Sequence, residues 1–131
     1  MHVHIAYRPG GRPASAASPL TLEHRRHAAG LVITVLGEVD LTNSAVLEQY
    51  VREHASPGER VVLDLTMLRF IDSSGLRTLE NLHAALRRDG GSLRLRGVHG
   101  VLARLLEITG RLPLLNIESF AGSPPPGRTR P

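Results

Sequence analysis

Apolar and polar positions recur along the chain with two different periods, and the changes of period mark the expected elements. Alternation with a period of two, or a short run of β-branched residues, is typical of strands, whereas apolar residues three and four positions apart are typical of helices. The pattern therefore predicts strands over Leu20–His27, Leu31–Val39, Arg60–Thr66, Ser92–Gly97 and Leu114–Phe120. It predicts helices over Thr42–His54, Ser73–Arg88 and Gly100–Thr109.

Strands and helices follow one another at the spacing of an α/β domain. This order predicts one mixed sheet of four to five strands with three or more helices packed on it. The mostly apolar run Val61–Leu65 reads as a strand covered on both faces, and right-handed crossovers would bring it into the middle of the sheet. Leu20–His27 alternates weakly and is expected at an edge. A short loop is expected between the strand ending near Leu65 and the helix that begins near Asp72 or Ser73.

The chain of 131 residues is about one domain long. Residues 1–19 read as a flexible leader in which a short strand over Val3–Tyr7 is possible, residues 20–120 as the folded domain, and residues 121–131 as a disordered Pro/Gly-rich tail. The sequence has neither eighteen consecutive apolar residues nor the apolar core of a signal peptide. We therefore expect a cytoplasmic protein that does not enter a membrane.

Composition narrows the range of possible chemistry. Cysteine is absent, and all sixteen cationic side chains are arginines, so thiol nucleophiles, Schiff-base chemistry and a lysine-containing phosphate loop are excluded. Residues 20–120 hold twelve Arg against twelve Asp plus Glu, and the net charge of +4 comes from the two ends of the chain. A nucleic-acid-binding domain usually carries a basic stripe on its folded surface. The charge pattern therefore argues against a nucleic-acid partner.

The segment Asp72-Ser73-Ser74-Gly75-Leu76 is the most informative stretch for function. It lies where the chain enters a helix, and helix N-termini present unpaired N–H groups and a partial positive charge. A phosphate on a serine hydroxyl there would meet N–H donors, although it would lie beside Asp72. The simpler interpretation is that these residues are helix caps, because Ser and Asp are favoured there in any protein. A Gly-x-Ser-x-Gly nucleophile elbow fits neither serine.

Two further groups of residues are candidate sites. At Gly37-Glu38-Val39-Asp40 a strand ends and a helix begins, so Gly37 permits a bulge or close approach and the acids can cap the next helix. His24 and His27 lie three apart on an expected strand and would point to opposite faces. No converging set of metal ligands is apparent, so neither a metal nor a cofactor is predicted.

Together, in this order and about thirty residues apart, the two motifs resemble those of the STAS family, the domain shared by sulfate transporters and bacterial anti-sigma-factor antagonists. Gly37–Asp40 matches the family's Gly-Glu-Leu/Val-Asp segment, and Asp72–Leu76 matches its Asp-Ser-Ser-Gly-Leu segment. The resemblance extends over roughly Leu20–Phe120.

The resemblance implies an anti-sigma-factor antagonist without an active site of its own. Such a protein would bind a serine kinase that acts as the anti-sigma factor, release the sigma factor, and be switched off by phosphorylation at Ser73 until a phosphatase restores it. The implied partner-binding residues are Asp40, Asp72, Ser73, Ser74 and Gly75. Two alternatives stay open: a scaffold or transport-associated STAS subunit that is never phosphorylated, and a sensor of a nucleotide or anion at the Ser73 helix terminus.

Overall fold

The computed structural model describes residues 2–7, 20–110 and 117. The strands are β1 (His2–Tyr7), β2 (Leu20–His27), β3 (Gly30–Val39), β4 (Arg60–Asp64), β5 (Leu68–Ile71) and β6 (Ser92–Arg96). The helices are α1 (Ser44–His54), α2 (Ser73–Arg88) and α3 (Gly100–Thr109).

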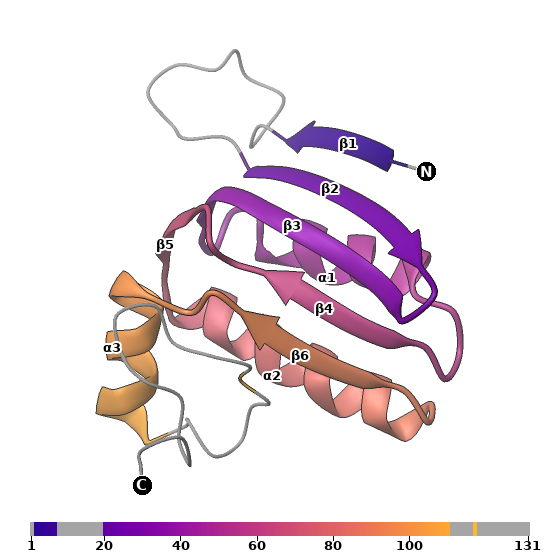
Figure 1. Ribbon diagram of the computed structural model, residues 1–131. Helices are drawn as coiled ribbons and strands as arrows, with labels where there is room; N and C mark the ends of the chain where they lie inside the picture. The colour runs from indigo at the N-terminus through magenta and orange to yellow at the C-terminus, as the bar shows by residue number, and fades with distance from the viewer. Residues whose placement is uncertain (1, 8–19, 111–116, 118–131) are drawn as a thin grey trace, which may run out of the picture.

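The six strands form one mixed sheet (Figure 1). Five follow the order β1-β2-β3-β4-β6, and β5 pairs with the end of β3 outside this path. The β1–β2 and β2–β3 pairs are antiparallel, and the pairs among β3, β4, β5 and β6 are parallel. Helices α1 and α2 cover one face of the sheet, and α3 lies at the end near β5. The predicted α/β class is confirmed, as is the interior position of the Val61–Leu65 run, which lies between β3 and β6.

The sequence predicted strand β2 at an edge of the sheet, but β2 lies between β1 and β3. The short strand considered over Val3–Tyr7 exists as β1 and pairs with β2 in register from His2 opposite Arg25 to Tyr7 opposite Leu20. The edge prediction was wrong because alternation reports only which face of a strand is buried. It does not report whether another strand pairs with it on each side, as β1 and β3 do with β2.

Strand β5 replaces the loop that was expected between Leu65 and the next helix. The Leu65 N–H still donates to the Arg96 carbonyl oxygen, and the Leu68 N–H then donates to the Leu65 carbonyl oxygen in a tight turn. This turn moves the chain from the β4–β6 side to the far end of β3. Four residues with only their first and last buried are too short for periodicity to reveal a strand.

The last predicted strand, Leu114–Phe120, lies outside the described residues except for one position. Ile117 forms an isolated parallel bridge with Leu95 on β6.

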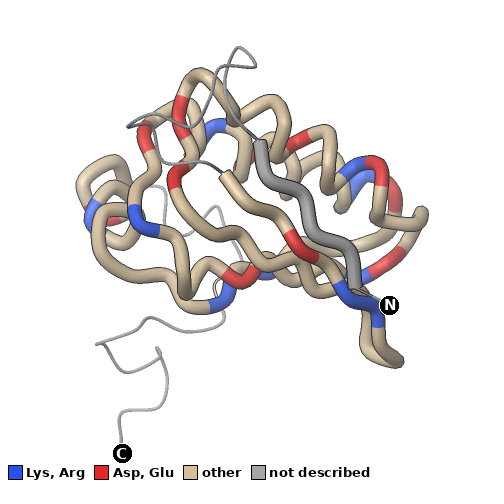
Figure 2. Tube along the Cα trace, turned by 90° about the horizontal axis from the view of Figure 1, so that it is seen from above, with Lys and Arg blue, Asp and Glu red and all other residues tan. Residues whose placement is uncertain are grey.

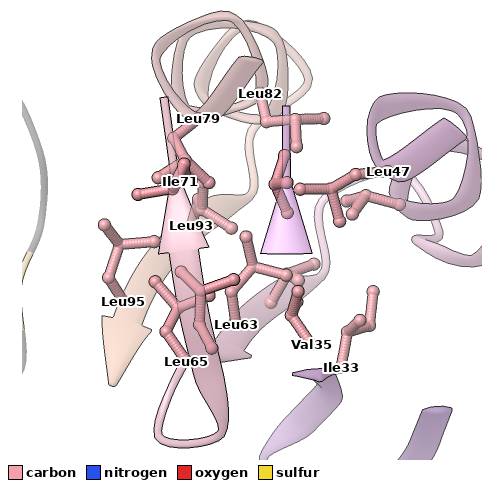
Figure 3. Close-up of a cluster of buried hydrophobic side chains, with 14 of the residues drawn as sticks. Ile33, Val35, Leu47, Leu63, Leu65, Ile71, Leu79, Leu82, Leu93 and Leu95 are labelled. Atoms are coloured by element: carbon pink, nitrogen blue, oxygen red, sulfur yellow. The ribbon is translucent and has the colours of Figure 1, made fainter. Parts of the chain in front are cut away.

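The core lies between the sheet and helices α1 and α2. Along β3, β4 and β6 every second side chain points toward these helices and is buried, and Leu and Val side chains from the helices meet them (Figure 3). The figure labels members from all these elements: Ile33, Val35, Leu47, Leu63, Leu79, Leu82 and Leu93. This packing anchors the start of α2 and the carboxyl ends of β3 and β5.

Candidate functional site

The two motifs found in the sequence lie side by side in the structure. Strand β5 pairs with the end of β3, so Glu38 lies opposite Phe70 and Val39 opposite Ile71. The Asp72 N–H then donates to the Val39 carbonyl oxygen at 3.2 Å. Segments about thirty residues apart in the chain therefore meet at one corner of the sheet.

Gly37 sits at an irregularity in the β3–β5 pairing. The register shifts between Gly37 and Glu38, and Gly37 adopts a φ of 102°, a conformation that side-chain-bearing residues rarely take. Its N–H donates to the Met67 carbonyl oxygen at 3.3 Å. This irregularity is of the kind that Gly37 was expected to permit, a bulge or a close approach.

Asp40 and Asn43 shape the turn between β3 and α1. The Asp40 carboxylate accepts hydrogen bonds from the N–H and the hydroxyl of Thr42. Asn43 occupies the N-cap position of α1, but its side chain bonds backward, donating to the Glu38 carbonyl oxygen and accepting from the Asp40 N–H. Neither side chain bonds an N–H group of the helix. The expectation that Asp40 caps α1 is thus corrected: its side chain and that of Asn43 stabilise the turn before the helix.

Asp72 is the N-cap of α2. Its Oδ1 accepts from the N–H groups of Ser74 at 2.9 Å and Gly75 at 3.1 Å, and from the Ser74 hydroxyl at 2.5 Å. Partial burial raises the pKa of this carboxyl, but the hydrogen bonds from Ser74, Gly75 and the backbone of Leu41 outweigh it, so the net pKa is lowered. The β3–α1 turn, through the backbone of Leu41, thus acts on the carboxyl at the start of α2. The cap interpretation is therefore correct for Asp72.

The two serines after Asp72 have different surroundings. The Ser74 hydroxyl donates to the Asp72 carboxylate. A serine inside a helix is generally expected to bond its own backbone instead. Ser73 is the first residue of α2, is exposed, and its hydroxyl has no hydrogen-bond partner within the described part of the chain. Ser73 thus offers a free hydroxyl at a helix N-terminus, and Ser74 does not.

Exposed apolar side chains occur on the elements around Ser73. Leu41, in the turn after β3, is 79% exposed, and Phe70 on β5 is 40% exposed. Val101, in the first turn of α3, is also exposed, and α3 packs against β5. A small hollow of about 170 Å³ lies between Leu68–Ile71 and His99–Leu102. The exposure of Phe70 follows from its position on β5, a strand that the periodicity of the chain did not predict.

Acidic and basic positions are interspersed along the described trace (Figure 2). No helix within the described residues is long and apolar enough to cross a membrane. In the same part of the chain, no three His, Asp or Glu side chains converge as metal ligands would.

The two strand histidines point to opposite faces, as predicted. His24 is buried, and its Nδ1 lies 2.7 Å from the Tyr50 hydroxyl oxygen. His27 is exposed at the end of β2.

Replacing Asp72 by alanine is expected to lower the free energy of unfolding by about 1 kcal/mol at neutral pH, because the α2 N-cap is lost. The folded-state pKa of Asp72 is below the ordinary value of 3.8, so this stabilisation is complete above that value and is lost as the pH falls through the folded pKa. Denaturant unfolding should therefore show a smaller difference between wild type and variant at about pH 3 than at about pH 7.

Asp89→Ala, at the other end of α2, is the control for Asp72→Ala. The Asp89 side chain caps no N–H group, so this variant should unfold at nearly the wild-type denaturant concentration. A loss equal to that of Asp72→Ala would contradict the capping role.

Comparison with known proteins gives a consistent result. Residues 19–120 match the family described as STAS domain. A curated relative from Listeria monocytogenes, "Anti-sigma-B factor antagonist", is 30% identical over 91 residues, covering 69% of this chain and 80% of the relative. The crystal structure of an anti-sigma factor antagonist from Mycobacterium paratuberculosis is 24% identical, with a TM-score of 0.65 over 75% of this chain and 84% of that chain. The Bacillus protein SpoIIAA, solved in its phosphorylated form, is 17% identical, with a TM-score of 0.52 over 75% of this chain and 91% of that chain.

Proposed function

The chain belongs to the STAS domain family, and from this membership we propose that it is an anti-sigma-factor antagonist switched by phosphorylation at Ser73. In its unphosphorylated form it binds a serine kinase that serves as the anti-sigma factor, and the sigma factor is released. Phosphorylation by that kinase ends the binding, and a serine phosphatase restores it. The protein acts in the cytoplasm as a substrate and binding module, without catalysis of its own.

The observation that carries this proposal is the free, exposed hydroxyl of Ser73 at the start of α2. A kinase must reach the serine hydroxyl and take up its proton. The Ser74 hydroxyl already donates that proton in a hydrogen bond to the Asp72 carboxylate, so Ser74 is a poorer phosphate acceptor. The names of curated relatives as anti-sigma factor antagonists and the phosphorylated form of SpoIIAA support the same role.

The partner surface that we propose comprises Asp40, Asp72, Ser73, Ser74 and Gly75. Within it, the Asp72 carboxylate holds the backbone N–H groups of Ser74 and Gly75, and the Asp40 carboxylate holds the turn that carries the exposed Leu41. The exposed apolar side chains of the neighbouring elements would supply buried area when a partner docks, while the polar groups position the serine.

Phosphosite mapping tests the proposal. Wild type, Ser73→Ala and Ser74→Ala are each incubated with ATP and the kinases of this type encoded in the genome of the source organism, and the products are mapped by mass spectrometry. One kinase should place a single phosphate on Ser73 of the wild type and of Ser74→Ala, and none on Ser73→Ala.

Phosphate on Ser74, or none on any of the three proteins, would contradict the switch. Stable binding of a kinase without phosphorylation would favour the scaffold alternative. The unfolding midpoint of each variant serves as the control for folding, because neither hydroxyl contributes to the core.

A further inference from the structure

The sheet face opposite α1 and α2 carries a hollow with a cationic rim. The hollow has a volume of about 490 Å³ and extends from the β2–β3 turn over the amino ends of β4 and β6 as far as Arg96, the last residue of β6. Its side chains point away from the helices because the alternate residues Val61 and Leu93 are buried toward them. Figure 1 shows this face toward the viewer. Its lining includes His27, Arg60, Val62, Ser92, Arg94 and Arg96, and no acidic residue within the described ranges.

Two of these arginines have no acid to neutralise them. In the parallel register of β4 and β6, Arg60 lies opposite Ser92 and Arg94 opposite Val62. Both arginines are exposed, and neither forms an ion pair within residues 20–110. Glu59, the acid next to Arg60 in the sequence, is held by the Arg26 guanidinium at 2.8 Å.

Neutral donors complete the rim. The His27 Nδ1 accepts a hydrogen bond from the Ala29 N–H at 3.2 Å, so the proton of the neutral ring must be on Nε2, which is then a donor. The Ser92 hydroxyl is a further donor, and Val62 forms an apolar part of the lining. The hollow thus combines the three guanidinium groups of its lining, two neutral donors and an apolar wall.

The arrangement of the two arginines indicates the kind of ligand. Arg60 and Arg94 are diagonal neighbours across a parallel strand pair, which puts their Cα atoms about 8 Å apart. Guanidinium groups on such a pair can each bind one of two linked phosphate groups in bidentate fashion. The volume lies within the usual range for small-molecule sites. Apart from His27, no lining residue has an aromatic ring, so a flat base would find little to stack on.

We propose that this hollow binds a small organic anion that carries two or more phosphate groups. The site lies at the amino ends of β4 and β6, whereas Ser73 follows the carboxyl end of β5. It therefore does not depend on the phosphorylation switch, and its test uses no kinase.

Isothermal titration calorimetry of the full chain with inorganic pyrophosphate and with fructose bisphosphate, at constant ionic strength, tests the proposal. Both probes should bind saturably with one site per chain, and the organic probe more tightly if the apolar wall contributes. Arg60→Gln/Arg94→Gln should weaken binding at least tenfold. Arg87→Gln/Arg88→Gln, at the end of α2 on the other side of the sheet, removes the same charge and should change affinity less than twofold.

Amide chemical shifts give the second readout. Titration of either probe should move the resonances of Gly30, Val62 and Ser92 and leave those of Ser73 and Ser74 unchanged. If the double variant at the hollow does not fold, Arg94→Gln alone is measured with the same criterion. No saturable binding, or equal weakening by the two double variants, would overturn the proposal, because the attraction would then be absent or due to net charge alone.

Discussion

Phosphorylation of Ser73 is expected to weaken binding to the kinase partner at least tenfold while leaving the fold intact. The modification adds about 1.5 to 2 negative charges at neutral pH. At the α2 N-terminus these charges meet a partial positive charge, which returns about 0.3–1 kcal/mol, so the unfolding midpoint should change little. At a docked interface the same dianion would be desolvated beside Asp72.

The size of the loss follows from the cost of like charges at an interface, which is several kcal/mol, and each 1.4 kcal/mol is tenfold in affinity. The Asp72 carboxylate adds to this cost because its lowered pKa keeps it ionised at neutral pH. Titration calorimetry of the phosphorylated and unphosphorylated proteins with the kinase measures the ratio directly.

Substitutions at Ser73 separate the effect of added negative charge on kinase binding from the effect of losing the hydroxyl. Ser73→Ala should bind the kinase constitutively, and Ser73→Glu should weaken binding only in part, since it carries one charge where phosphate carries nearly two. Ser74→Ala is the matched control for a lost hydroxyl. Equal affinities for the phosphorylated and unphosphorylated proteins would contradict the proposed switch.

Gly75→Ala is expected to destabilise the protein by about 1–3 kcal/mol through overpacking. Gly75 is buried in the first turn of α2, and a Cβ there would lie 2.8 Å from the Ile71 Cδ1 and 2.9 Å from the Val39 Cγ1. Both neighbours are buried, so neither can move aside freely. For a domain of about one hundred residues, each 1 kcal/mol lowers the unfolding midpoint by about 4–8 °C.

Helix propensity makes the sign of this effect informative. Alanine is favoured over glycine in a helix interior by about 1 kcal/mol, so propensity alone predicts that Gly75→Ala stabilises the protein. Only the close approach of α2 to β3 and β5 predicts the opposite. Asn81→Ala, at an exposed position of the same helix, should leave the midpoint unchanged or raise it. A raised midpoint in Gly75→Ala would show that the helix start shifts easily and is not held against the sheet.

Much of the fold was readable from the sequence because it depends on local periodicity. The apolar stripe of α2 predicted its bounds as Ser73–Arg88, and Gly110 ends α3 with a φ of 71° in the C-cap position expected from its lack of a side chain. The position of Ser73 at a helix N-terminus follows from the same local pattern. These features are set by neighbours within about four residues, which is the range that a sequence pattern reports.

The tertiary structure alone decided what surrounds that serine. Strand β5 is four residues long and pairs with β3 across about thirty residues, and this pairing joins Asp72 to Val39. The different hydrogen bonding of Ser73 and Ser74 depends on where the Asp72 carboxylate points, which no residue type specifies. The cationic hollow likewise requires the parallel register of β4 and β6. Pairing partners and side-chain directions result from long-range packing, and for that reason the periodicity of the chain could not predict them.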